Sequence, residues 1–497
     1  MYTGSEWSFD LLEKVYNECE KIAFDELKLR IYPNQLEIIS SEQMLDAYSS
    51  SGLPILYKHW SHGKHFSIEE RNYKKGYTGL AYEIVINSNP CINYLMEENT
   101  MTMQTMVIAH AAFGHNHFFK NNYLFRQWTD ASHIIDYLIF AKNYINDCEE
   151  KYGADVVEKI IDSCHAIARH GISRYKRPVK LNIYEETEKK EEREEYLRKI
   201  YNDLWRTVPK TKKQEKLKLD LAFSDPEENV LYFIEKNSPI LKSWQREIVR
   251  IIRKINQYFY PQYQTKVMNE GWATFTHFYT MNRLHEKGLI TDGAILEFLH
   301  MHSSVVYQPD FNNNRYSGFN PYYLGFEMFR DIRRVCEEPT EEDKEWFPDF
   351  VNTDWLDTCL NAVVNYRDES FIRQFLSPTL IRKMKLFTLN NNTDEEHYIV
   401  EHIHNKEGYK HIRETLASQY EVGNMIPDIQ VQGALFKGDR SLILQHNINN
   451  GKILKGANNV LTHIKRLWGY PVKLECRENG TLSKIFSTGS QTQLEIE

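Results

Sequence analysis

The segment Met103-Gln-Thr-Met-Val-Ile-Ala-His110-Ala-Ala-Phe-Gly-His115-Asn-His117-Phe118-Phe119 holds the densest histidine cluster of this 497-residue chain. Helical patterning dominates from about residue 101 to residue 171, so the segment predicts a mainly helical body. Neutral imidazole is the commonest protein ligand for a transition metal, and the cluster therefore also predicts a metal site. Ordinary histidines held by hydrogen bonds are the equal alternative.

The spacing of the histidines limits which of them can share an ion. On a regular helix, His110 and His115 diverge by about 140°. Gly114 precedes His115 and can break or bulge the helix, which would let the two rings converge. His117 shares a face with His110 but lies roughly 10 Å farther along the axis, so it is a reserve ligand. The segment is not H-E-x-x-H, because Ala111 stands where that motif has its general base.

A second segment supplies a carboxylate. Glu270 lies in Thr265-Lys-Val-Met-Asn-Glu-Gly-Trp-Ala-Thr-Phe-Thr-His277, a helical stretch otherwise rich in apolar and small residues. A carboxylate is costly to bury there unless it is paired or binds a metal. We predict that His110, His115 and Glu270 bind one divalent ion, with His277, on the same face as Glu270, as a further reserve ligand. A Glu270–arginine ion pair is the alternative.

Two residues are candidates for catalytic roles. Glu83 lies in Ala81-Tyr-Glu-Ile-Val-Ile, a predicted strand whose two faces are both largely apolar, so burial would raise its pKa toward that of a general base. An edge-strand glutamate facing water is the alternative. Tyr316, in a loop rich in asparagine and aromatic residues before Asn320-Pro-Tyr, is the candidate donor to a carbonyl oxygen. His165 is a weaker candidate for supporting the site.

The patterning predicts a mainly α main domain at 1–385 with a few short strands, and a small α+β domain at 386–486. The main domain begins with an amphipathic helix over about 8–30, and a helix is expected after Asn320-Pro-Tyr. A charged insertion is predicted at 184–218 and a disordered tail at 487–497. Short β-like runs at 398–400, 429–431, 441–444 and 472–474 alternate with helices near 407–419 and 456–468 in the C-terminal domain.

Composition excludes several classes of protein. The net charge of −8 is spread along the chain, which argues against a nucleic-acid binder; only short basic runs at 174–180 and 210–218 favour one. Seven scattered cysteines without a C-x-x-C pair predict neither a disulfide framework nor a cysteine-rich zinc site. No stretch resembles a signal peptide or reaches the roughly 20 apolar residues of a membrane span. A cytoplasmic protein is expected.

Ten segments in order over residues 1–385 resemble the SpoVR family, the stage V sporulation protein R-like proteins. They are Ile31-Tyr-Pro-Asn-Gln, Tyr82-Glu-Ile-Val-Ile-Asn-Ser-Asn-Pro, Ala109-His-Ala-Ala-Phe-Gly-His-Asn-His-Phe-Phe-Lys, Ile135-Asp-Tyr, Trp244-Gln-Arg-Glu-Ile, Tyr258-Phe-Tyr-Pro-Gln, Met268-Asn-Glu-Gly-Trp-Ala-Thr-Phe, Asn320-Pro-Tyr, Leu324-Gly-Phe and Tyr366-Arg-Asp-Glu-Ser-Phe.

The resemblance implies a cytoplasmic bacterial protein that takes part in sporulation, in particular in formation of the spore cortex. It also implies a serine protein kinase and a von Willebrand-type protein as partners in one pathway. Combined with the candidate residues, it predicts a metal-dependent enzyme, zincin-like in arrangement, with zinc as the favoured ion and an amide bond of a peptide or peptidoglycan precursor as substrate. A non-enzymatic scaffold or regulatory protein of cortex assembly is the competing hypothesis.

Overall fold

The computed structural model describes residues 1–50, 53, 55–74, 83–174, 227–316, 318–390, 399–402, 404–435, 438–448, 454, 456–478 and 480–488. Packing divides the chain into two compact units. Unit 1 comprises 1–54, 60–127 and 261–421; unit 2 comprises 55–59, 128–260 and 422–497. The predicted charged insertion at 184–218 and all but the first two residues of the predicted tail lie outside the described residues.

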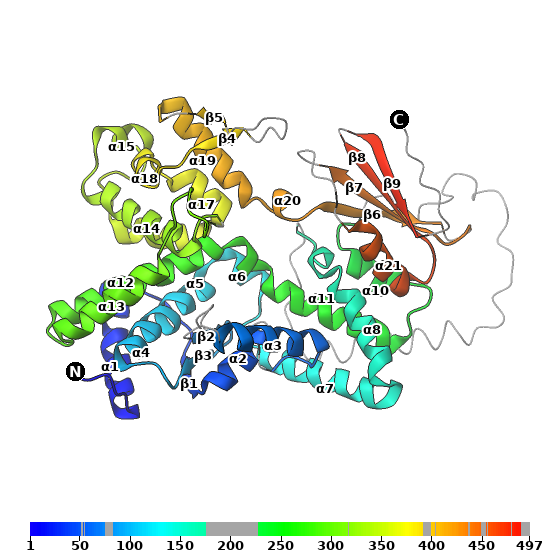
Figure 1. The fold of residues 1–497 in the computed structure, drawn as a ribbon, viewed down its shortest axis with the longest axis horizontal. Coiled ribbons are helices and arrows are strands. Elements are labelled where there is room, and N and C mark those ends of the chain that lie inside the picture. Colours follow the sequence, from blue (N-terminus) through cyan, green and yellow to red (C-terminus); the bar gives the residue numbers. More distant parts are fainter. Residues whose placement is uncertain are drawn as a thin grey trace. The chain divides into compact units, whose positions relative to one another are not determined.

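Unit 1 is mainly helical. Its helical segments are α1 (Phe9–Lys21), the π-helix η1 (Ile22–Glu26), α2 (Ser41–Ser49), α3 (Trp60–Lys74), α4 (Met101–Val107), the π-helix η2 (Ile108–His115), α5 (Asn116–Asn121), α6 (Tyr123–Trp128), α12 (Lys266–Glu286), α13 (Asp292–Val305), α14 (Pro321–Glu337), α15 (Glu341–Trp346), α16 (Trp355–Asn365), α17 (Asp368–Phe375), α18 (Pro378–Lys383) and α19 (Lys406–Gln419). The mainly helical body predicted from the sequence is confirmed (Figure 1).

Two small sheets accompany these helices. The strands β1 (Asn34–Ile39), β3 (Cys91–Met96) and β2 (Glu83–Ile86) lie side by side in that order, with β1 parallel and β2 antiparallel to β3. The strands β4 (Thr388–Asn390) and β5 (Ile399–His402) form an antiparallel pair. The predicted strand around Glu83 is confirmed as β2, whereas β1 and β3 were not predicted. Both β2 and β3 pack against η2, so the first sheet brings Glu83 toward the histidine cluster.

Unit 2 combines helices with a four-stranded sheet. The helical segments are α7 (Ile134–Tyr152), α8 (Ala154–His165), η3 (Ala168–His170), α10 (Val230–Asn237), α11 (Ser243–Gln264, which crosses into unit 1 at Pro261), α20 (Val422–Met425) and α21 (Ala457–Trp468). The sheet has the order β6 (Asp428–Ala434), β7 (Leu442–Ile448), β8 (Val472–Glu478), β9 (Thr481–Ser487). Helix α21 connects the parallel strands β7 and β8.

The C-terminal α+β region is confirmed, with one correction. The β-like runs at 429–431, 441–444 and 472–474 lie in β6, β7 and β8, and the predicted helices are α19 and α21. Ser487, predicted to begin a disordered tail, instead ends β9, because its backbone pairs with Lys473 of β8. Helix α19 packs on α17 and α18 of unit 1. The predicted domain limits of 1–385 and 386–486 stay a prediction.

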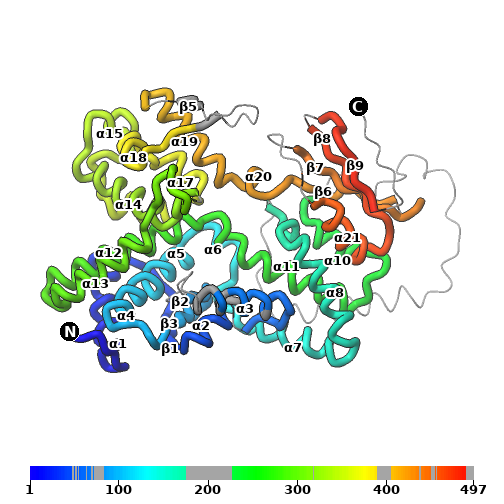
Figure 2. Tube along the Cα trace, viewed as in Figure 1, coloured from blue at the N-terminus to red at the C-terminus, as the bar shows by residue number. Residues whose placement is uncertain are grey.

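Helix α12 lies in the centre of unit 1 and contacts α4, η2, α5 and α14 (Figure 2). Its Trp272 is fully buried, as are Phe113 of η2 and Phe329 of α14. Two glycines allow the close approach of α12 to α14. A methyl group added to Gly325 would overlap the Val267 carbonyl oxygen, and one added to Gly271 would overlap the Gly325 backbone.

We expect Gly325→Ala to lower the free energy of unfolding by about 3 kcal/mol, because the backbone atoms it meets cannot rotate away. Urea denaturation measures the change. Gly293→Ala is the matched control: its added methyl would lie 3.7 Å from the Thr291 hydroxyl, so the gain in helix propensity should make this variant neutral or slightly more stable. Equal effects of the two variants would contradict the close-packing argument.

All seven cysteines are free and buried. Among the described residues, no helix has both the length and the apolar character that crossing a membrane requires.

Candidate metal centre

The π-helix η2 brings His110 and His115 together. Residues five apart are hydrogen-bonded neighbours in a π-helix, so the five-residue spacing that separates the two rings on an α-helix places them on one face here. Their ring centroids lie 4.5 Å apart at an interplanar angle of 90°. The predicted convergence is confirmed, and its cause is a continuous π-helix.

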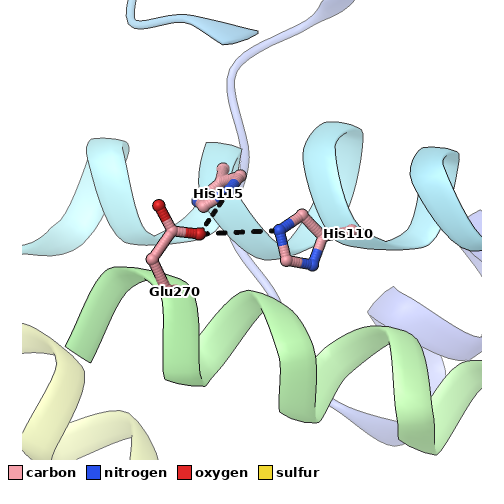
Figure 3. A group of neighbouring side chains, drawn as sticks. All are labelled: His110, His115 and Glu270. Carbon is pink, nitrogen blue, oxygen red and sulfur yellow. Dashed lines mark ion pairs between the residues drawn. The ribbon is translucent and has the colours of Figure 1, made fainter. Parts of the chain in front are cut away.

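Gly114 does not break this helix, as one interpretation of the sequence had it, but gives α12 room. A methyl group added to Gly114 would lie 2.6 Å from the Cα atom of Ala273. The close approach of η2 and α12 places Glu270, in the first turns of α12, opposite the two imidazoles (Figure 3). The two histidines and the glutamate therefore come from two helices, and small residues at the contact let these helices pack closely.

The three side chains form one cluster with the dimensions of a metal site. Oε2 of Glu270 lies 3.5 Å from Nε2 of His115 and 3.8 Å from Nε2 of His110 (Figure 3). One potential ligand atom from each residue lies within 4.8 Å of those of the other two. Ligand atoms about 2.1 Å from one ion lie roughly 3–4 Å apart, so the cluster fits a single ion. The predicted triad is thus assembled, and the residues present could hold a metal ion.

The outer nitrogen of each imidazole has a partner. Nδ1 of His115 lies 3.0 Å from Oδ1 of Asn269, and because a carbonyl oxygen only accepts, this nitrogen carries the proton. Nδ1 of His110 lies 2.9 Å from Nδ1 of His277. Both Nε2 atoms face Glu270. Metal-binding histidines adopt this arrangement: one ring nitrogen points toward the ion, and the other is hydrogen-bonded to a neighbouring group.

Burial sets the charge of the cluster. It lowers the pKa of His115 to about 4, so this imidazole is neutral at physiological pH. Burial raises the pKa of Glu270, whereas positive charge on His115 and His110 and a hydrogen bond from Tyr322 lower that pKa, so the carboxylate is ionised when a cation faces it, whether an imidazolium or a metal ion. Its Oε2 atom is buried and has no hydrogen-bond partner. Such an atom is costly unless a cation binds it, and the described ion-pair partners of Glu270 include no arginine.

Glu83 lies at the edge of the cluster. Its Oε1 atom is 3.8 Å from Nε2 of His110, and its side chain is 21% exposed, which leaves it open to water. Burial, together with the charge of Glu270, raises the pKa of Glu83 despite the opposing effect of His110. Glu83 is therefore a half-buried carboxyl group beside the triad, and its role as general base stays a prediction.

The phenol beside the cluster is that of Tyr322. Its hydroxyl group hydrogen-bonds the Glu270 carboxylate, and its ring is stacked with that of His110 at 6.3 Å. Tyr316 instead packs against Phe311 and Phe319, and no described contact joins it to the triad. The proposed catalytic role of Tyr316 gains no support from these contacts. The sequence analysis did not single out Tyr322; the expected helix start at Asn320-Pro-Tyr, where Asn320 accepts from the Tyr322 backbone N–H, places this tyrosine in the first turn of α14.

The other candidate histidines lie outside the triad. Nδ1 of His117 accepts from the Arg30 backbone N–H at 2.9 Å, so His117 ties the loop after η1 to α5. His165 belongs to unit 2, where its Nε2 lies 2.5 Å from the Tyr57 hydroxyl. His277 contacts His110 and is a supporting residue in the present arrangement.

Asp368 holds the N-terminus of α12 and so positions Glu270. Its two carboxylate oxygens accept from the backbone N–H groups of Val267 and Met268, each at 2.9 Å. Burial raises the pKa of Asp368 to about 7 although these hydrogen bonds lower it. The first turn of the helix that carries Glu270 is thereby fixed to α17.

We expect Asp368→Asn to destabilise the protein by about 1–3 kcal/mol at pH 4, because the hydroxyl oxygen of the protonated carboxyl group can still accept from a backbone N–H, whereas the amide NH2 group cannot. The folded-state pKa is above the unfolded value of about 3.9, so the stability contributed by protonated Asp368 is present below pH 4 and is lost as the pH rises toward 7. The difference in unfolding free energy between wild type and variant should therefore shrink over this range in urea titrations. A constant difference would show that Asp368 does not titrate there.

Two family models together match most of the chain. Residues 6–425 match a family model described as "SpoVR like protein", and residues 427–479 match one described as "SpoVR-like C-terminal domain". A relative from Escherichia coli (strain K12), named "Uncharacterized protein YcgB", is 54% identical over 485 residues, which are 97% of this chain and 95% of the relative. No solved structure matches the chain.

Proposed function

The chain belongs to the SpoVR-like protein family, and we propose that it is a metal-dependent enzyme that hydrolyses an amide bond. His110, His115 and Glu270 would hold one divalent ion, with zinc favoured and iron or manganese as the alternatives. Two histidines and one glutamate form the ligand set of several zinc hydrolases, and two histidines with one carboxylate also form that of non-haem iron enzymes.

One observation supports the proposal above all others. Oε2 of Glu270 is buried without a hydrogen-bond partner and faces two Nε2 atoms. The Nδ1 atom of His115 donates to Asn269, so its Nε2 presents a lone pair toward Glu270. A buried anion faced by imidazole lone pairs is unfavourable without a cation, and a divalent ion would relieve all three groups.

The residues around the triad could carry out hydrolysis. A bound divalent ion supplies a Lewis acid that polarises a carbonyl group. Glu83 would accept a proton from the attacking water as oxygen bonds to the carbonyl carbon. It would then deliver that proton to the amine nitrogen as the carbon–nitrogen bond breaks. The Tyr322 hydroxyl, which contacts Glu270, would hold that carboxylate in place.

The substrate we propose is an amide bond in a peptide or peptidoglycan precursor, as cortex formation would require. The resemblance to the family implies relatives in bacteria that form no spores, and the E. coli relative matches almost the whole chain. The reaction would therefore not be confined to spores, although in a sporulating cell it would serve the cortex. A serine protein kinase and a von Willebrand-type protein remain the proposed partners of the pathway.

The competing function, a scaffold of cortex assembly, predicts that the triad is structural. The decisive experiment is elemental analysis of protein purified without an affinity tag or chelator, followed by mass spectrometry of peptide and muropeptide mixtures incubated with it. About one equivalent of metal and release of new amine termini would support the enzyme. Protein that stays metal-free after addition of zinc, iron or manganese would overturn the proposal and favour the scaffold.

A further inference from the structure

We propose that His277 and His302 form a buried relay that positions His110 for metal binding. This inference rests on the proposed metal site and adds two residues to it. In a neutral imidazole only one ring nitrogen has a free lone pair, so His110 can bind an ion through Nε2 only while its proton stays on Nδ1. The relay would fix the proton there.

The three rings are joined end to end. Nδ1 of His110 lies 2.9 Å from Nδ1 of His277, and Nε2 of His277 lies 3.0 Å from Nδ1 of His302. The three residues are at most 5% exposed, and they come from η2, α12 and α13. The relay therefore runs inward from the triad through the interior of unit 1.

One assignment of protons satisfies every contact once His110 Nε2 faces the ion. His110 then donates from Nδ1 to Nδ1 of His277, which must carry its own proton on Nε2. That proton is donated to Nδ1 of His302, which leaves the third proton on Nε2 of His302. Each ring thus fixes the tautomer of the ring before it. In such a chain of hydrogen bonds, each bond also polarises its neighbour and strengthens it.

Aromatic packing holds the far end of the relay. The ring of His302 contacts Phe278, Phe298 and Phe326 with centroid separations of 4.9, 5.6 and 4.8 Å. Phe298 also contacts His277 edge-on at 5.8 Å. Because these rings confine the rotamers of both histidines, His277 is a rigid acceptor and not a side chain that could turn toward the ion. This explains why His277, a reserve ligand on sequence grounds, is better placed outside the triad.

The two ligand histidines are supported differently. His115 donates to a single amide oxygen, that of Asn269, whereas His110 donates to an imidazole that is itself hydrogen-bonded. An outer partner of a metal-binding histidine typically accounts for about 10–100-fold in metal affinity. We therefore expect a substantial share of the affinity of the site to depend on two residues that do not touch the ion.

The test measures zinc dissociation constants by chelator competition in the full-length protein, alongside urea unfolding of the metal-free forms. We expect His277→Phe to weaken zinc binding by about 10–100-fold and His302→Phe to weaken it by less. His277→Gln should recover part of the loss, because its amide oxygen can accept from His110. Phe329→Leu is the matched control: Phe329 is buried in the same unit and packs against Trp272 and Phe275, and no described contact joins it to the relay, so this variant should lower stability and keep the affinity.

A second readout follows the proton itself. In cobalt-substituted protein, the Nδ1 protons of the two ligand histidines should give two shifted, exchangeable proton NMR signals. His302→Phe should speed solvent exchange of one signal and leave the other unchanged. Equal affinity losses in His277→Phe and Phe329→Leu, or unchanged exchange in His302→Phe, would overturn the relay while the metal site stands. A wild type that binds no zinc would overturn the proposed function and the relay with it.

Discussion

Glu270→Gln is expected to abolish stoichiometric metal binding while the protein stays folded. Glutamine keeps the shape of the side chain but removes the only negative charge among the three ligand groups, and the divalent ion loses the carboxylate that best offsets its charge. Because loss of an outer partner already costs about 10–100-fold in affinity, loss of a ligand should cost more than about 100-fold. Elemental analysis and chelator competition measure the loss.

The direction of the stability change separates a metal ligand from a structural carboxylate. Oε2 of Glu270 is buried and unpartnered, so removing its charge should leave the metal-free protein as stable as wild type or more so. His117→Ala is the control: it removes a buried histidine that accepts from the Arg30 backbone, so it should lower stability but retain the metal. Retention of one equivalent of metal in Glu270→Gln would show that Glu270 is not a ligand.

The sequence predicted those features that depend on local patterning. Apolar positions at helical spacing identified the helix now seen as α1 and η1, in which Leu12, Val15 and Cys19 are buried. Asn320 followed by Pro321 identified the start of α14, because asparagine caps a helix and proline is favoured at its first position. These signals lie within a few residues of each other, so tertiary contacts do not override them.

Features that depend on distant contacts were missed. Strands β1 and β3 pair in parallel across more than fifty residues, and neither shows the strict alternation that would mark a strand. Strand β9 was not predicted and its last residue, Ser487, was assigned to the tail; pairing with β8 stabilises this strand. The packing of residues 128–260 with 422–497 in unit 2 likewise has no counterpart in local sequence.

The candidate site lies between these two cases. The triad could be proposed because histidine and glutamate are costly in apolar helices, and that argument needs only composition. The geometry of the triad could not be predicted, because the choice between an α-helix and a π-helix over Ile108–His115 depends on packing against α12. The same limit explains Tyr316 and Tyr322: the loop composition pointed to a tyrosine near the site, but helix α14 decides which one reaches it.

Glu83→Gln is expected to lower the rate of amide hydrolysis by about 100- to 10,000-fold without loss of the metal, because a positioned general base contributes about that much. Glutamine keeps the size of the side chain beside His110 but cannot accept a proton from water. Glu83 is not one of the three residues whose potential ligand atoms lie close together, so the variant should keep the bound ion. Turnover of the peptide or muropeptide that the wild type cleaves is compared at equal metal occupancy.

The hydrolysis rate and the metal content of Glu83→Gln, measured together, distinguish a general base from a metal ligand. A general base changes kcat at constant metal content, whereas a fourth ligand changes the metal affinity first. Glu297→Gln is the matched control, since Glu297 accepts from the Thr100 hydroxyl at 2.7 Å in the same unit and no described contact joins it to the triad. Loss of metal in Glu83→Gln would make Glu83 a ligand, and an unchanged rate would assign the proton transfer to another group.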